Sequence, residues 1–182
     1  MRRVLQGTAL IFLAAAVAPS GPATAVPVET AAPPAAMSVV MPSADGTIVL
    51  SGSVATIRGT TLRWEPEEKK RTLGFWTKAE DAAEWTFAVE AAGDFDVEVL
   101  QGCGKGQGGS EMIVVVDPAR AAPPTIRFVV EDTGGFQEFR ARTVGRLTLA
   151  AGEHVLRVKP ERIAKHAACD IRQIRLVPAG PR

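Results

Sequence analysis

The sequence predicts an all-β protein with one domain, an antiparallel β-sandwich of the jelly-roll type. From Gly46 onward, apolar and polar residues alternate with a period of two, as in strands that bury one face. Gly and Pro interrupt the apolar runs at spacings near ten residues, which is typical of turns between short strands. We find no long helical pattern and no internal repeat, and the long connections between residues 100 and 136 favour a jelly roll over a simple meander.

The first part of the chain has the pattern of an export signal. Two basic residues precede an apolar run that ends in small residues, so we expect residues 1–25 to be a cleaved signal peptide. Residues 26–44 are rich in Pro and Ala and are predicted to be a spacer. The β-sandwich then covers residues 45–178 and leaves a tail at 179–182. The mature chain is expected to be secreted or periplasmic, without a membrane span, because no later apolar segment is long enough.

The strands follow from the alternation. The clearest is 95–100, where Phe95, Val97 and Val99 share one face, and the preceding strand should place Trp85 and Phe87 in the core. Residues 77–85 show the only passable helical pattern, and we expect one turn at most because a strand pattern resumes at once. The predicted strands are 47–52, 54–59, 61–64, 85–90, 95–100, 111–117, 125–131, 143–149, 154–160 and 170–177.

The distribution of charge is uneven although the net charge of +1 is small, and a small net charge does not indicate a nucleic-acid partner. Acidic residues dominate from Ser38 to Gly135, and basic residues dominate from Phe136 to Arg182. One interpretation is that oppositely charged strands pair across a sheet. The other is a basic face that attracts an acidic or sulfated glycan.

A glycine-rich segment, "VLQGCGKGQGGSE" at 99–111, contains the spacing G-x-G-x-x-G at Gly104, Gly106 and Gly109. A dinucleotide or phosphate site needs a helix after such a loop, because the amides of the helix N-terminus hold the phosphate. Here a strand pattern follows, so a phosphate-binding role is disfavoured. The glycines instead suit a tight connection, or a place where a ligand comes close to bare backbone.

Two cysteines and two histidines offer little catalytic chemistry. Cys103 and Cys169 form an even pair in an exported chain, which favours a disulfide over free thiols, although the sequence alone does not bring them together. With His166 they could instead supply three metal ligands, a poor set without a fourth. No nucleophile has a base at motif spacing, and acidic loop residues alone do not indicate hydrolysis. We therefore expect no catalytic residues and no enzyme activity.

Aromatic residues at loop edges are the better candidates for binding. Trp76 and Phe136 stand beside glycines in predicted loops, where a ring can face solvent and stack on the apolar face of a sugar. The neighbouring Lys105, Gln107 and Gln137 could bond to sugar hydroxyls.

Three segments together resemble a known family: "LGFWTKAEDAAEW", "GDFDVEVLQGCGKGQGGSE" and the run from "VEDTGGFQEF" to "CDIRQIRL". They are similar to the galactose-binding-like jelly-roll accessory domains, specifically to carbohydrate-binding modules of families six and thirty-five. Similar domains are appended to exported bacterial sulfatases and α-L-fucosidases. The resemblance runs from about Asp45 to Pro178.

The resemblance implies a sugar-binding cleft formed by loops at one end of the sandwich, lined by Phe136 and the glycine-rich segment. It places Cys103 and Cys169 at neighbouring loop ends, which implies a disulfide between them. Such modules often hold a structural calcium ion. Asp170 matches the ligand of the final strand, but "IVLSGSVA" lacks the usual glutamate of the first strand, so we expect no cofactor and no metal site.

The sequence therefore predicts an exported, non-catalytic domain that recognises an oligosaccharide or polysaccharide through Trp76, Lys105, Gln107, Phe136 and Gln137. The partner is a glycan, for which an acidic or sulfated chain is one alternative. A second function remains open: an interaction domain that docks an exported hydrolase or the cell envelope without binding sugar.

Overall fold

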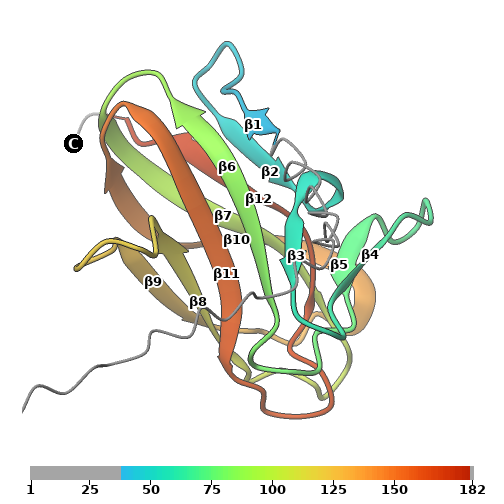
Figure 1. The fold of residues 1–182 in the computed structure, drawn as a ribbon. Coiled ribbons are helices and arrows are strands. Elements are labelled where there is room, and N and C mark those ends of the chain that lie inside the picture. Colours follow the sequence, from blue (N-terminus) through green and yellow to red (C-terminus); the bar gives the residue numbers. More distant parts are fainter. Residues whose placement is uncertain (1–37, 181–182) are drawn as a thin grey trace, which may run out of the picture. The chain divides into compact units, whose positions relative to one another are not determined.

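The computed structural model describes residues 38–180, and within them strands form two facing sheets (Figure 1). The all-β prediction is confirmed. The predicted signal peptide and the spacer before Ser38 lie outside the described residues. No helix among the described residues is long and apolar enough to cross a membrane.

The first sheet has the strand order β1-β6-β11-β8-β9, and β3 also pairs with β6. β1 runs parallel to β6, whereas the other pairs are antiparallel. Figure 1 shows β6 and β11 side by side in front of the second sheet. The strands of this sheet are β1 (Val39–Val40), β3 (Thr56–Arg58), β6 (Ala82–Val89), β8 (Glu111–Val116), β9 (Thr125–Val129) and β11 (Gly152–Arg162).

The second sheet is antiparallel and has the order β10-β7-β12-β5-β4, with β2 also paired to β12. A short 3-10 helix, Gly52–Val54, follows β2. The strands of this sheet are β2 (Ile48–Ser51), β4 (Arg63–Glu65), β5 (Thr72–Gly74), β7 (Gly93–Cys103), β10 (Gly135–Leu149) and β12 (Asp170–Pro178).

The core lies between the two sheets and follows the predicted alternation. Trp85 and Phe87 of β6 are buried, and so are Phe95, Val97 and Val99 of β7. Removing such side chains from water is the main stabilising contribution to a sandwich of this kind. The inward residues of neighbouring strands interdigitate in one continuous cluster.

Charged residues on the outer faces pair across neighbouring strands. Arg146 of β10 binds Asp96 of β7 through two hydrogen bonds of 2.7 and 3.0 Å, and Arg175 of β12 lies 2.9 Å from Glu98. The interpretation of the uneven charge as cross-strand pairing is thus confirmed, because basic late strands lie beside acidic early ones.

The stretch 77–85 contains one turn at most, as expected: a turn at 79–80 precedes β6, which begins at Ala82. Two other local expectations differ from the structure. β1 lies inside the predicted spacer and pairs with β6. β10 begins at Gly135, well before the predicted strand at 143, because this polar edge segment bonds only to β7 and needs no buried alternation.

Candidate functional site

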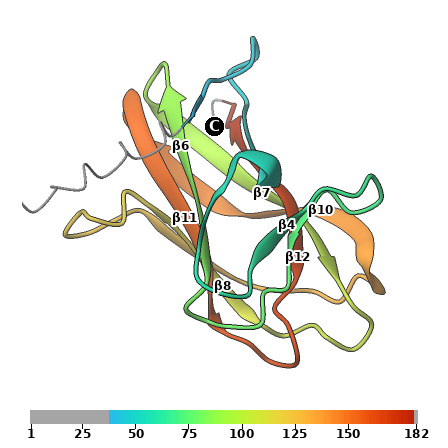
Figure 2. The same cartoon turned by 45° about the vertical axis from the view of Figure 1, so that its right-hand side comes forward.

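A cleft of about 530 Å³ opens at one end of the sandwich. The connections that follow β5, β7 and β11 gather at this end, the lower one in Figures 1 and 2. Loop ends of a β-sandwich are free to vary without disturbing the core, so binding residues commonly lie there. The cleft is lined by Glu65, Lys70, Phe75, Thr77, Gly104, Lys105, Gln107, Phe136, Gln137, His166, Ala167 and Asp170.

Four of the five residues predicted to bind a ligand, Lys105, Gln107, Phe136 and Gln137, line this cleft. The fifth, Trp76, does not. Its ring is fully buried in the core, and its indole N–H donates a hydrogen bond of 2.9 Å to the carbonyl of Asp81. The expectation of a solvent-facing Trp76 is therefore wrong, because the largest ring of the segment gains most from burial.

Phe75, the preceding residue, takes the position in the cleft. Phe75 is 43% exposed, and the guanidinium of Arg63 stacks on one face of its ring, at 3.4 Å from the centroid. Its φ of 60° lies in the left-handed region, which costs free energy for a residue other than glycine. This backbone change at the end of β5 turns Phe75 toward the cleft. The adjacency of Phe75 to Trp76 was visible in the sequence, but not which ring would face outward.

The Phe136 ring lies against glycines. A Cβ atom on Gly104 would lie 2.7 Å from Cε2 of Phe136, and one on Gly102 would lie 2.1 Å from its carbonyl oxygen. Side chains at these positions would thus displace Phe136 from the wall of the cleft. Close approach between β7 and the start of β10 explains these two glycines of the segment 99–111.

The loop that carries Lys105 and Gln107 is held by hydrogen bonds. The Asp132 carboxylate accepts from the amides of Gly106 and Gly134. These two bonds lower the pKa of Asp132. The amide of Gln107 donates to the carbonyl of Gly104 at 2.8 Å, and its side-chain oxygen accepts from the amide of His166 at 3.4 Å. The backbone of this loop and the side chain of Gln107 are therefore held in place.

Two buried carboxyl groups form the floor of the cleft. Glu65 of β4 accepts a hydrogen bond of 2.6 Å from the Lys70 ammonium, and Asp170 begins β12 beside them. A Cβ atom on Gly74 would lie 2.4 Å from Oε2 of Glu65 and 3.2 Å from Oδ1 of Asp170, so both carboxyl groups lie against that glycine. Burial, and secondarily the charge of Glu65, raise the pKa of Asp170 to about 7, although Lys70 opposes this rise.

These residues do not fit a calcium site. Calcium takes six or more oxygen ligands, whereas Asp170 has one neighbouring carboxylate that is already paired with an ammonium group. Among residues 38–180, no group of three or more His, Cys, Asp or Glu side chains is placed to hold a metal ion. Asp170 is therefore a cleft residue without the ligand set that the resemblance implied.

The predicted disulfide is not formed: Cys103 and Cys169 are both free and fully buried. The sulfur of Cys103 lies 3.8 Å from the carbonyl oxygen of Gly104. Burial, followed by the charges of Asp132 and Asp170, raises the pKa of Cys103 to about 11, and burial also raises that of Cys169. Both thiols thus stay protonated and pack as small apolar groups. The number of cysteines and the cellular compartment indicate whether a disulfide can persist. They do not indicate whether the two sulfur atoms point toward each other.

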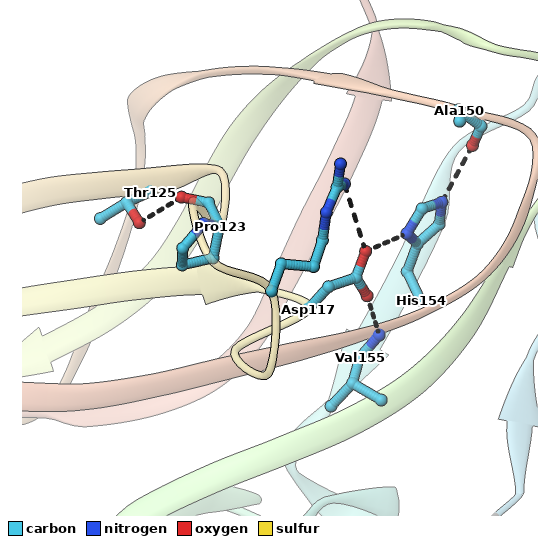
Figure 3. Close-up of polar contacts among 7 residues, drawn as sticks. Asp117, Pro123, Thr125, Ala150, His154 and Val155 are labelled. Carbon is cyan, nitrogen blue, oxygen red and sulfur yellow. Dashed lines mark hydrogen bonds and ion pairs between the residues drawn. The ribbon is translucent and has the colours of Figure 1, made fainter.

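Asp117 and His154 form a pair (Figure 3) that does not line the cleft. His154 Nδ1 is 2.8 Å from Asp117, and Nε2 is 2.9 Å from the carbonyl oxygen of Ala150. In a catalytic triad that second nitrogen would face a hydroxyl or thiol nucleophile. Here it faces a backbone carbonyl, while the other Asp117 oxygen accepts from the amide of Val155. The pair therefore ties the β8–β9 connection to β11, and its role is structural.

No protein-family model matches the chain, and no curated protein matches it. Solved structures do. The C-terminal CBM6 of LamC, a laminarinase from Zobellia galactanivorans, superposes with a TM-score of 0.59 at 13% identity, over 72% of this chain and 98% of that one. A carbohydrate-binding module of Cellvibrio mixtus lichenase 5A, solved with cellotriose, gives 0.57 at 14% identity, over 72% and 97%.

A GH26–CBM35 β-(1,4)-mannanase from Podospora anserina superposes with a TM-score of 0.54 at 17% identity. The match covers 76% of this chain and only 29% of the mannanase. At such identities the similarity shows the fold, and the jelly-roll prediction is thereby confirmed.

Proposed function

We propose that the chain is a non-catalytic carbohydrate-binding domain that recognises an oligosaccharide or polysaccharide in the cleft between Phe75 and Phe136. The observation that carries this proposal is the exposed side chain of Phe75, held by a left-handed backbone at the rim of a largely apolar cleft that several polar side chains also line. Strained residues persist where the surrounding structure enforces them, and they cluster at binding sites.

Recognition would be an equilibrium between stacking and hydrogen bonding. A sugar ring has apolar C–H faces that can stack on Phe75 or Phe136, while its hydroxyls bond to polar side chains. Gln107, Gln137 and Lys105 supply donors and acceptors along one wall. The volume of about 530 Å³ lies within the range of small-molecule sites.

The fold supports the proposal without extending it to a particular sugar. The similar solved structures are named as carbohydrate-binding modules, and one of them was solved with cellotriose. An acidic or sulfated ligand has weaker support, because Arg146 and Arg175 are already paired with Asp96 and Glu98. The alternative role is an interaction domain that docks an exported hydrolase or the cell envelope without binding sugar.

The test is a glycan array probed with the wild-type chain, followed by calorimetry on the retained glycans. We expect Phe75→Ala and Phe136→Ala each to weaken binding by about 10-fold, the equivalent of one stacking contact. Val129→Ala is the matched control, because Val129 is 53% exposed on β9 and does not line the cleft. Retention of no glycan by the wild-type chain would contradict the proposal and favour the interaction domain.

A further inference from the structure

The floor of the cleft carries more negative than positive charge. Glu65 and Asp170 are 8% and 5% exposed, and both face the cleft. Lys70 supplies the ammonium group of the floor, and its hydrogen bond of 2.6 Å commits it to Oε1 of Glu65. When both acids are ionised, Lys70 pairs with Glu65, and the Asp170 carboxylate has no counterion.

Asp170 also lacks a hydrogen-bond donor. Among residues 38–180, no side chain or amide forms a hydrogen bond with its carboxylate, and no hydrogen bond contributes to its pKa. A buried carboxylate is costly unless it is paired or hydrogen-bonded, and the pKa of about 7 reflects that cost. This acceptor points into a ligand cleft and is therefore available to a donor on the ligand.

The other basic side chains of the cleft do not pair with Asp170. Lys105 is exposed at the rim, and its charge acts on Asp132. His166 is exposed in the β11–β12 connection. The charges that act on Asp170 are those of Glu65 and Lys70. A neutral sugar placed over this floor would remove more water from Asp170 and favour its protonated form, whereas an ammonium group would pair with the carboxylate.

We propose that the cleft selects an amino sugar, whose ammonium group binds Asp170 beside Glu65 while its ring stacks on Phe75 or Phe136. This inference rests on the proposed function and names the chemical class of its ligand. The ammonium would donate to Asp170 and to the second oxygen of Glu65, since Lys70 holds the first. Gly74 leaves the space between the two carboxyl groups free of a side chain.

The experiment compares two oligosaccharides with the same β-1,4 backbone: a glucosamine tetramer and its fully N-acetylated counterpart. They differ by an ammonium and a neutral acetamide on each ring. Calorimetry of the full chain at pH 7 should give at least about 10-fold higher affinity for the glucosamine tetramer. An oligomer of a uronic acid serves as the third ligand and should bind most weakly, because it places a carboxylate near Asp170.

The decisive variant is Asp170→Asn, which keeps the size of the side chain and removes its charge. It should weaken glucosamine binding by about 10-fold and change binding of the N-acetylated tetramer by less than about 2-fold. Glu138→Gln is the charge control, because Glu138 is exposed on β10 and does not line the cleft. Thermal unfolding should show that Asp170→Asn is folded, since the substitution removes an uncompensated buried charge.

Equal or tighter binding of the N-acetylated or uronic acid ligand by the wild-type chain would overturn the inference. So would a preference for glucosamine that survives in Asp170→Asn. The failure of the amino-sugar inference is distinguishable from that of the proposed function. If other glycans bind and Phe75→Ala weakens them, the carbohydrate-binding function stands and the amino-sugar preference falls. If no glycan binds at all, both fall.

Discussion

Asp81 shows how one buried carboxylate positions the cleft. Its two oxygens accept hydrogen bonds from the amides of Thr60, Thr61 and Leu62, at 2.8 to 2.9 Å, and from the Thr61 hydroxyl at 2.6 Å. Its own carbonyl accepts from the indole of Trp76. The residue thereby fixes the connection that buries Trp76 and, one position earlier, presents Phe75 to the cleft.

We expect Asp81→Asn to lower the free energy of unfolding by about 2 to 3 kcal/mol, because the new amide group cannot accept from all of these donors. Chemical denaturation measures this change. Glu80→Gln is the control, since Glu80 is exposed in the same connection. A loss no larger than that of the control would show that the carboxylate does not hold this connection.

The same residue predicts an acid dependence of stability. Burial opposes ionisation, but the bonds from Thr61, Leu62 and Thr60 outweigh it and lower the pKa of Asp81 from 3.8 to about 2. Since the pKa is lower in the folded chain, the stabilisation is complete above about pH 4 and is lost as the pH falls toward 2. Between pH 4 and 2, the wild-type chain should lose more stability than Asp81→Asn does.

At the scale of elements, the end of β7 and the connection to β8 lie close to the start of β10, because Gly102 and Gly104 have no side chains that would separate them from Phe136. Gly104 forms an isolated bridge with Gly134, and its missing side chain leaves room for the ring of Phe136. The glycine-rich segment therefore shapes the wall of the cleft rather than gripping a phosphate. Its G-x-G-x-x-G spacing is followed by strand β8, not by a helix.

Gly104→Ala should displace the Phe136 ring and weaken glycan binding by about 10-fold, similar to the loss expected for Phe136→Ala. Calorimetry with the best ligand of the array measures this. Gly93→Ala is the matched control, because Gly93 begins β7, the strand that Gly104 follows, and a Cβ atom there meets nothing within 4 Å. Unchanged affinity in Gly104→Ala would mean that the ring position does not matter for binding.

At the scale of the whole molecule, both thiols lie inside the core that the two sheets share. They become accessible when the sheets separate, so their reaction with a thiol reagent reports global opening. The folded, unreduced chain should show no reactive thiol, and the chain unfolded in denaturant should show two, one for each cysteine. Absence of thiols in the unfolded, unreduced chain would reveal a disulfide and contradict the structure.

The alternation of residues along the chain was sufficient to predict the sandwich. Period-two patterns identify strands, and buried rings such as Trp85 and Phe87 follow directly from them. The short strands β1 and β5 were missed, as was the first half of β10, because none of them carries a clear alternation. Their pairing depends on neighbouring strands that are distant in the sequence.

The sequence by itself determined the fold class, the core faces of the long strands and the loop residues Lys105, Gln107, Phe136 and Gln137 as neighbours of a cleft. Tertiary structure alone decided that Phe75 and not Trp76 faces that cleft, because a left-handed φ at one residue reverses which side chain points outward. It also decided that the two thiols remain free and that Glu65, Lys70 and Asp170 meet. These contacts join residues up to about a hundred positions apart, and their geometry depends on packing and strand register, which local patterns do not encode.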